Sequence, residues 1–402
     1  MKRLWWFSAF FLLYELTVYL TNDMIMPGMP SVMAEFGGPS RYIGLSLSLY
    51  ILGGCTLQIG LGPLADRIGK RRVMLGGAAF FLLATALVPM AGSAPQFLAI
   101  RFFQGMGSCF IFIGYAAIHE LFDDTRAVKL TTLMGNTTVF APLIGPVAGS
   151  AVISVFDWRA VFVTAFVLGA VAWLGLARTM PAGGGKPLAA GDKSLTASYR
   201  AIFTNRTFML GILVAGLAIT PLTAWIGLSP AILLQHGGAS YGTYIAWQCA
   251  IFVGFVLSTF AIGRMGGELP LGRLLRQGGV LAVVGLGGAG FAAGQPQLFI
   301  ACMFVFSAGF GLFNGALIRI ALTATGQSMS LTSAAMSLLY CLYIALGLEL
   351  YNAICERFGY TLQAYALCGV PVALAVCAGL FHIARGHDAR VRDAVAGLPD
   401  LA

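Results

Sequence analysis

Ionisable side chains inside long apolar runs are the features of this sequence best suited to chemistry. Glu15 and Asp23 interrupt the first such run of the 402-residue chain, and Arg101 interrupts a later one. An ionisable group at membrane depth costs at least about 2.5–3.5 kcal/mol, so it marks a functional site by default. A carboxyl group in a low-dielectric setting can hold a proton near neutral pH and release it when a cation approaches. These three residues are therefore candidates for proton exchange.

The polar residues of the first run are spaced so that they form a stripe along one helix. At about 100° per residue, Glu15, Tyr19 and Asn22 share a narrow face. Asp23 follows Glu15 by eight residues, which is roughly 12 Å along a helix axis. A single arginine cannot neutralise two acids at that separation, so we expect at least one acid to exchange protons. The alternative is that both acids only pair with Arg101 and hold helices together.

The composition restricts the kind of protein in which this chemistry takes place. Hydrophobic residues make up 58% of the chain and charged residues 10%, whereas a soluble domain has about 25% charged residues. So few charged side chains cannot cover the surface of a soluble protein of this size. These values exclude a soluble enzyme, a nucleic-acid-binding protein and a disordered chain. They predict a protein that crosses the lipid bilayer many times.

The cysteines and histidines show no pattern typical of a metal site or a nucleophilic enzyme. All 8 cysteines fall in apolar runs and none forms a C-x-x-C pair, so we interpret them as small buried hydrophobic residues. The 4 histidines lie at the ends of apolar runs or in the C-terminal tail. We therefore predict no metal ion, no catalytic residue and no cofactor, with protons as the coupling ion.

Twelve apolar stretches long enough to cross a bilayer follow one another along the chain. We predict an all-α membrane protein with twelve transmembrane helices in two six-helix bundles, 1–180 and 206–385. A cytoplasmic central loop at 181–205 joins the bundles, and a cytoplasmic tail follows at 386–402. The predicted spans are 4–27, 43–61, 73–91, 96–118, 129–153, 159–179, 207–234, 241–263, 275–293, 297–320, 332–354 and 361–384.

The placement of the 24 basic residues predicts how the chain is oriented in the membrane. With a cytoplasmic N-terminus, nearly all of them fall in cytoplasmic segments. The exceptions are Arg41, Arg159 and Arg357 on the opposite side and Arg101 within a span. Because Lys and Arg concentrate in cytoplasmic loops, both termini are predicted to be cytoplasmic. The net charge of +9 thus reflects topology and not nucleic-acid binding.

A glycine-rich basic segment, GPLADRIGKRR at 62–72, follows the second predicted span. Two glycines allow a tight turn, the basic run stays at the cytoplasmic surface, and the aspartate can bond an arginine or a facing helix N-terminus. The segment resembles the loop 2–3 motif of the major facilitator superfamily, and an ordinary cytoplasmic loop is the alternative. The resemblance assigns a gating role to Gly62, Asp66, Arg67, Gly69, Lys70 and Arg71.

Two further segments carry the same resemblance. RFFQG, which begins at Arg101, is similar to a fourth-span motif whose arginine is implicated in proton coupling. APLIGPVAGS at 141–150 resembles the family's antiporter motif, although Ala141 and Ser150 stand where glycines are usual. Small residues four apart let helices approach closely, so plain helix packing is the alternative interpretation. The motif positions are Pro142, Gly145, Pro146 and Gly149.

The first half of the chain is similar to the MdfA-type multidrug transporters of this superfamily. The first span, with Glu15, Asp23 and the residues around them, carries most of the likeness. In that group, acids at these two positions are implicated in proton and drug binding, and an arginine at the position of Arg101 completes the site. The resemblance also implies that a substrate pocket is lined by Tyr19, Asn22, Met134, Leu222 and Ile226.

These observations predict a proton-coupled secondary transporter that exports lipophilic neutral or cationic drugs by alternating access. Its partners are the bilayer, small substrates and protons, and we expect a monomer in the inner membrane of a bacterium. One alternative is an importer or facilitator for a nutrient, osmolyte or siderophore. Another is a membrane-embedded enzyme or sensor, which would need a catalytic group or a soluble output domain.

Overall fold

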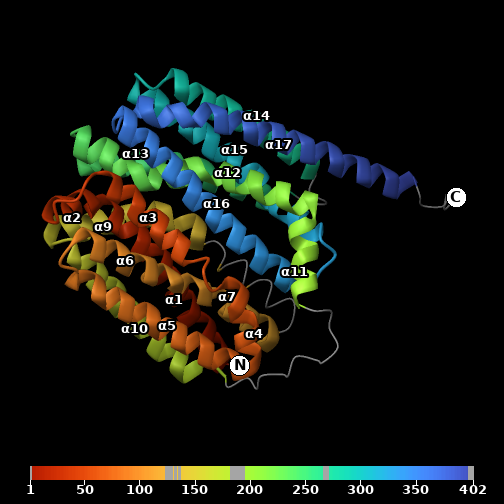
Figure 1. The fold of residues 1–402 in the computed structure, drawn as a ribbon, viewed down its shortest axis with the longest axis horizontal. Coiled ribbons are helices and arrows are strands. Elements are labelled where there is room, and N and C mark those ends of the chain that lie inside the picture. The colour runs from red at the N-terminus through yellow and green to blue at the C-terminus, as the bar shows by residue number, and fades with distance from the viewer. Residues whose placement is uncertain are drawn as a thin grey trace.

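The chain folds into a bundle of helices, as predicted (Figure 1). The computed structural model describes residues 2–122, 130, 134, 137–181, 195–265 and 271–396, and within these ranges every regular element is helical. The α-helices are α1 Lys2–Ile25, α2 Met29–Glu35, α3 Arg41–Gly53, α4 Gln58–Ile68, α5 Lys70–Leu87, α6 Ala94–Gly105, α7 Ile111–Leu121, α9 Thr137–Val155, α10 Arg159–Thr179, α11 Leu195–Thr204, α12 Arg206–Ser229, α13 Tyr241–Gly263, α14 Leu271–Phe291, α15 Pro296–Thr323, α16 Met329–Phe358 and α17 Leu362–Ala396.

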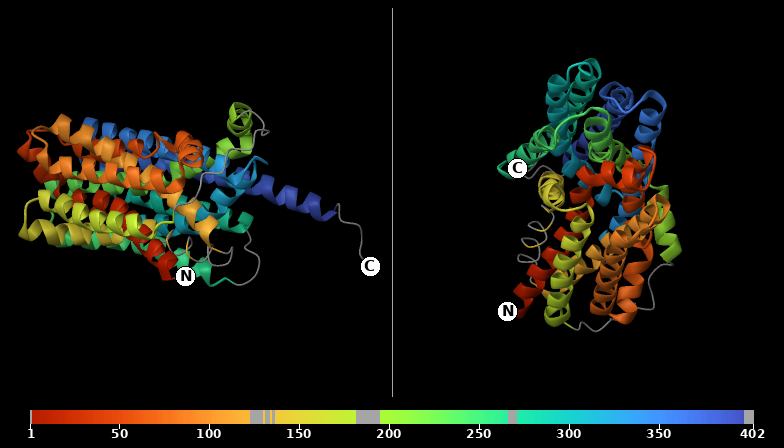
Figure 2. Two further views of the ribbon diagram at one scale, coloured as in Figure 1. Left: turned by 90° about the horizontal axis from the view of Figure 1, so that it is seen from below. Right: turned by 90° about the vertical axis from the view of Figure 1, so that its left-hand side faces the viewer.

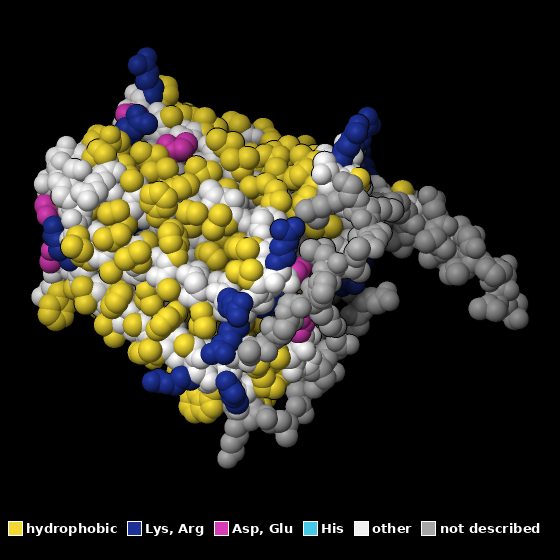
Figure 3. Space-filling view, turned by 60° about the horizontal axis from the view of Figure 1, so that its bottom comes forward, with side chains coloured by type: hydrophobic (Ala, Val, Ile, Leu, Met, Phe, Trp, Pro, Cys, Tyr) yellow, Lys and Arg dark blue, Asp and Glu magenta, His cyan; other side chains and the backbone are white. Residues whose placement is uncertain are grey.

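The helices have the length and apolarity needed to cross a membrane. Within the described ranges, 11 helical segments meet both requirements, and a shorter apolar helix, Phe140–Val155, lies at the place of the fifth predicted span. Figure 3 shows apolar side chains over the middle of one face, with Lys and Arg gathered toward its ends. The arrangement fits a bilayer around the middle of the bundle.

The two ends of the bundle can be told apart by the chain connections. Helix α1 begins and α17 ends at one end, which we call the termini end (Figure 2). The other end, which we call the far end, carries the connections from α2 to α3, from α9 to α10 and from α16 to α17. The start of α1 and the end of α17 therefore lie on one side of the bundle, and the cytoplasmic location of that side stays a prediction.

The first-half helices α1–α10 pack mainly with one another, as do the second-half helices α12–α17 (Figure 1). In the first half α1 contacts α9 and α10, and in the second half α14 contacts α15 and α17. Helix α16 contacts α3, and α13 contacts α9, across the interface between the halves. The interface is thus built from a few long helices.

Among the described residues, the hydrophobic core that both halves share includes first-half residues from the far end. One large cluster includes Met26 and Val32 of the first half together with Trp225 and Tyr244 of the second. Toward the termini end, a separate cluster contains only first-half residues, from Phe7 to Met180. Burial of apolar surface stabilises the contact between the elements that bury it. The contact between the halves is therefore more strongly stabilised at the far end than at the termini end.

Prolines interrupt the first helix directly after its acidic residues. Helix α1 ends at Ile25, a 3₁₀ turn covers Met26–Gly28, and α2 begins at Met29. Pro27 and Pro30 have no backbone N–H to donate, so a regular helix cannot continue through them. The end of the polar stripe is therefore also a bend in the chain.

The prediction of a plain loop at 181–205 is wrong in its second part, because α11 lies there. Ile202 is fully buried, and Tyr199 and Phe203 pack at its sides against Phe208 and Ala321. Apolar residues spaced three and four apart form one face of a helix. The polar residues between them make this segment too polar to resemble a membrane span.

Helix α17 continues into the predicted C-terminal tail as far as Ala396 (Figure 1). Beyond the predicted end of the span at 384, Asp388 accepts a hydrogen bond from Arg276 Nη1 at 2.5 Å. No proline follows Pro371 within α17, so the helix has no strong breaker at the membrane boundary.

Candidate proton and substrate site

Arg101 occupies the centre of a hydrogen-bonded group in the first half. Its side chain is fully buried, and its guanidinium donates to Ser46 Oγ at 3.3 Å, to Gln104 Oε1 at 2.5 Å and to Asn22 Oδ1 at 2.6 Å. The ring of Tyr50 covers the guanidinium, with 4.5 Å between Cζ and the ring centroid. Three elements and a cation–π contact thus hold one positive charge in place.

Asn22 connects this arginine to Asp23. While its carbonyl oxygen accepts from Arg101, its amide nitrogen donates to Asp23 Oδ1 at 3.2 Å. Both side chains are buried. No salt bridge joins Arg101 to a carboxylate in the part of the chain that the structure describes. The alternative of a direct pairing between the acids and Arg101 is therefore wrong, and an amide mediates between the charges.

Glu15 has different surroundings from Asp23. Its Oε1 accepts a hydrogen bond from the hydroxyl of Tyr115 on α7 at 2.7 Å, and the carboxyl group is buried. Tyr19, one helical turn along, interacts electrostatically with Glu15. The two acids on one continuous helix therefore have separate partners, as their spacing led us to expect.

The antiporter-motif residues bring the backbone of α9 against α1 beside Asp23. A Cβ atom at Gly145 would overlap the Cβ of Asp23, and one at Gly149 would overlap the carbonyl oxygen of Met24. Only glycine permits this approach. Pro142 and Pro146 lie within the same helix. Both glycines therefore position the acidic end of α1.

The predicted pocket residues lie in two places. Tyr19 and Met134 belong to the first-half core toward the termini end, and Asn22 contacts Arg101. Leu222 and Ile226 are buried on α12 in the core that both halves share. Their common role in substrate binding stays a prediction.

A cavity of about 430 Å³ lies near the termini end, between first-half helices α4 and α7 and the start of α16. Tyr115, the partner of Glu15, contributes to its wall, so Glu15 lies directly behind that wall. None of the five predicted pocket residues contributes to it. The wall is formed by Gln58, Leu61, Gly62, Ala65, Asp66, Lys70, Cys109, Phe112, Ile113, Tyr115, Ala116, His119, Glu120, Met329, Ser333 and Ala334.

The glycine-rich basic segment is mostly helical, and only one of its glycines makes the turn. Helix α4 continues to Ile68, and Gly69 turns the chain with a φ of 93°. Gly62 lies within α4 and has no positive φ, so the expectation that Gly62 helps to form the turn is wrong. Backbone hydrogen bonding extends the helix past the predicted end of the second span at 61 until a residue with positive φ ends it.

The charged residues of this segment attach it to neighbouring helices. Lys70 forms an ion pair with Glu120 on α7. Arg71 Nη2 donates to the carbonyl oxygen of Ala177 at 2.6 Å, near the end of α10, where helix carbonyls lack partners. Arg67 is exposed and Asp66 contributes to the cavity wall. The segment is thus attached to two neighbouring helices, α7 and α10, beside the cavity, and its gating role stays a prediction.

A buried polar group on the second half was not among the predicted site residues. Tyr244 and Gln248 of α13 and Ser229 at the end of α12 have no exposed surface. The signal was present, because a tyrosine and a glutamine four residues apart stand on one face of an otherwise apolar span. Neither residue is charged, so neither carries the large cost that marks an ionisable group at membrane depth.

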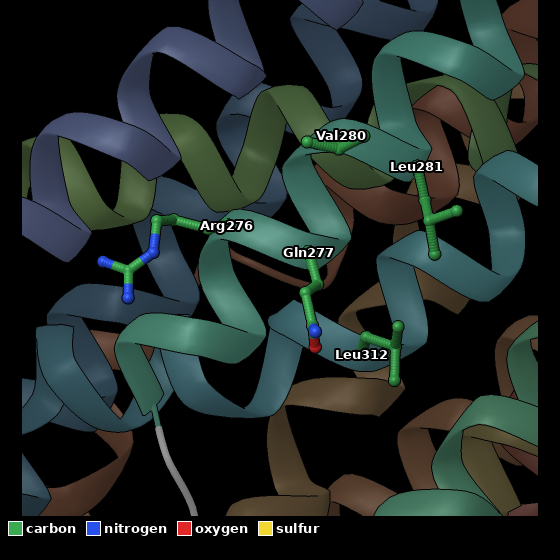
Figure 4. Close-up of a pocket in the computed structure, with 5 residues that line it drawn as sticks. All are labelled: Arg276, Gln277, Val280, Leu281 and Leu312. Carbon is green, nitrogen blue, oxygen red and sulfur yellow. The ribbon is translucent and has the colours of Figure 1, made fainter.

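A second hollow, of about 440 Å³, lies on the outer surface of α14 and α15 (Figure 4). Val280 and Leu281 form its apolar part, and Arg276 at its edge donates a hydrogen bond to Asp388.

In the hollow, as in all of the described ranges, no group of three or more His, Cys, Asp or Glu residues could hold a metal ion. The hollow is separate from the acids of α1.

Comparisons with known proteins agree on the type of protein. The sequence profile of the Major Facilitator Superfamily matches residues 11–348. A multidrug transporter MdfA from Yersinia pestis bv. Antiqua (strain Angola) is 38% identical over 358 residues, which cover 87% of each chain. One from Edwardsiella piscicida is 36% identical over 356 residues, covering 87% of this chain and 86% of the relative. The crystal structure of a D-xylose–proton symporter shares the fold, with a TM-score of 0.72, 15% identity, and coverage of 93% of this chain and 97% of that chain.

Proposed function

The chain belongs to the major facilitator superfamily, a family of transporters and not of enzymes, and from this premise we propose that it exchanges protons for lipophilic neutral or cationic drugs and exports them. The curated relatives of similar length are multidrug transporters. The observation that carries the proposal is the pair of buried acids on α1, where Asp23 accepts a hydrogen bond from the Asn22 amide and Glu15 accepts one from the Tyr115 hydroxyl. Burial disfavours the charged form of a carboxyl group and an approaching cation favours it, so each acid can gain and lose a proton.

In the proposed cycle, Glu15 and Asp23 take protons from outside the cell, and the arriving drug displaces them. A cationic or hydrogen-bonding drug at Asp23 competes with the proton for the same oxygen atoms. Arg101 keeps its charge near Asp23 through Asn22 and so favours release of that proton. Each proton that enters supplies about 2.3 kcal/mol per 100 mV of membrane potential, in addition to the pH gradient.

Alternating access requires the halves 1–180 and 206–385 to rock about the site between them. At the far end, Arg41 pairs with Glu356 at 3.5 Å, Asn352 Nδ2 donates to the carbonyl oxygen of Arg41 at 2.8 Å, and Ser40 bonds His236 at 3.1 Å. These contacts must break when the site opens there. With cytoplasmic termini, the cavity near the termini end is the route by which drugs enter.

The remaining predicted residues have supporting roles in this proposal. The five predicted pocket residues contact the lipophilic part of the drug, and the glycine-rich basic segment closes the termini end when α4 and α16 draw together. The protein works as a monomer in the inner membrane of a bacterium. The five residues that we propose to line the drug pocket are Tyr19, Asn22, Met134, Leu222 and Ile226.

Efflux by inverted membrane vesicles tests the proposal. A Glu15→Gln and Asp23→Asn double variant keeps the size of both side chains and removes both titratable groups, so proton-driven drug efflux is expected to stop. Asp157→Asn is the matched control, because Asp157 is an exposed acid at the far end that pairs with Arg159. Undiminished efflux in the double variant would contradict the proposal.

A further inference from the structure

A buried glutamine in the second half has an amide group without partners. Gln248 has no exposed surface, and neither its Oε1 nor its Nε2 takes part in a hydrogen bond in the ranges that the structure describes. Tyr244 lies one helical turn before it on the same face of α13. The hydroxyls of Tyr244 and Ser229 are neighbours, and neither bonds to any other described residue.

This polar group lies across the interface from Asp23. The phenol of Tyr244 interacts electrostatically with the Asp23 carboxyl group. The turn that follows Ser229, Pro230–His236, contacts the 3₁₀ turn that follows Asp23. Helix α13 also packs on α9, whose Gly145 touches Asp23. Tyr244 therefore faces the acid across the interface, and Gln248 follows it by one turn on the same face of α13.

Buried amide groups almost always have hydrogen-bond partners, so an unpaired one indicates a ligand or water that completes it. A primary amide donates through its nitrogen and accepts through its oxygen, whereas a hydroxyl can do either. Apolar surface cannot satisfy these groups. The partner that fits is a neutral polar group, such as a hydroxyl, an amide or a carbonyl.

We propose that Gln248, with Tyr244 and Ser229, forms a hydrogen-bonding subsite for a neutral polar group on the transported drug. The cationic or lipophilic part of the same molecule lies at Asp23. The subsite rests on the proposed export function and narrows its substrate class, because compounds that carry a hydroxyl, amide or carbonyl bind better than equally lipophilic compounds that lack one.

A matched pair of cations tests this subsite. Tetraphenylphosphonium has no hydrogen-bonding group, and its analogue with one para-hydroxyl group differs by that group alone. Binding of both to the purified full-length protein gives a ratio of dissociation constants. We expect the unchanged protein to prefer the hydroxylated cation by about 2- to 10-fold, the range of one hydrogen bond.

Gln248→Met is expected to abolish the preference while leaving the affinity for tetraphenylphosphonium within about 2-fold, since this cation has no group that could form a hydrogen bond with the amide. Tyr244→Phe provides a second variant that removes a single oxygen atom and is expected to reduce the preference in part. Gln277→Met makes the same substitution at an exposed position on the outer surface and is expected to keep the full preference.

The failures of the two proposals have different signatures. If the unchanged protein binds neither cation, both the subsite and the proposed function are overturned. If it binds both cations equally, or if its preference survives in both the Gln248→Met and the Tyr244→Phe variants, the subsite is overturned and drug binding is retained. Loss of the preference in the Gln277→Met control would also overturn the assignment to Gln248.

Discussion

Two buried polar groups, one in each half of the protein, differ in how completely their hydrogen bonds are made. In the first half, Arg101 donates to three side chains and Asn22 passes the connection on to Asp23. In the second half, the amide of Gln248 has no partner among the residues that the structure covers. The first group is already arranged without a ligand. The second has spare hydrogen-bonding capacity, which suits a site that accepts varied compounds.

Removing the centre of the complete group is expected to have the largest effect. Arg101→Met leaves Ser46, Gln104 and Asn22 without their shared donor and Asp23 without a nearby positive charge. We expect the free energy of unfolding to fall by about 3–5 kcal/mol, as when one partner of a buried charged group is lost. Denaturant unfolding of the purified protein measures it.

Arg273→Met is the matched control, because Arg273 is exposed on α14. Its free energy of unfolding is expected to stay within about 0.5 kcal/mol of the unchanged protein. Equal losses of unfolding free energy in the two variants would show that Arg101 contributes no more to stability than an exposed arginine does.

Breaking the connection inside the complete group is expected to cost less. Asn22→Ala removes the bond to Arg101 and the bond to Asp23, and we expect a loss of about 2–3 kcal/mol in the free energy of unfolding. The same variant is expected to change the pH at which drug binding is half-maximal, because Asp23 loses a donor. An unchanged pH profile would mean that Asn22 does not link the two charges.

Separating α9 from α1 tests whether the first group depends on helix approach. Gly149→Ala places a methyl group against the carbonyl oxygen of Met24, and overpacking of this kind costs about 1–3 kcal/mol. Gly60→Ala is the control, since a Cβ there meets nothing within 4 Å, and its stability is expected to stay equal or rise. If both alanine variants keep the stability of the unchanged protein, close approach of α9 is not required.

The smallest effect is expected in the second group, and it has the opposite sign. Gln248→Met replaces an unpaired amide by an apolar side chain of similar length, so the free energy of unfolding is expected to stay equal or rise by up to about 2 kcal/mol. Thermal unfolding of the two proteins side by side measures the difference. A loss of stability would show that Gln248 has a structural partner, and the contrast between the halves would disappear.

Much of the fold and part of the site could be predicted because they follow from local patterns. The boundaries of α10 and α13 match the predicted spans 159–179 and 241–263, since long apolar runs ended by polar residues leave little freedom. Membership of the transporter family is likewise confirmed. Glu15, Asp23 and Arg101 were recognisable because a charge in an apolar run is rare.

The remaining features depend on contacts between distant segments. Asn22 looked like one more member of a polar stripe, and its bridging role appears only when α6 brings Arg101 beside it. The role of Tyr115 depends in the same way on α7 lying against α1. Gln248 is uncharged, so its residue type alone does not mark it as a site residue. It is marked by the absence of hydrogen-bond partners among the described residues.

Proton release on drug binding tests the central claim most directly. Tetraphenylphosphonium is added to the purified protein in weakly buffered detergent solution, and a pH indicator reports the protons set free. We predict release by the unchanged protein and none by the Glu15→Gln and Asp23→Asn double variant, with Asp157→Asn behaving like the unchanged protein. Equal release from the double variant and the unchanged protein would contradict the claim that the two acids of α1 exchange protons for drug.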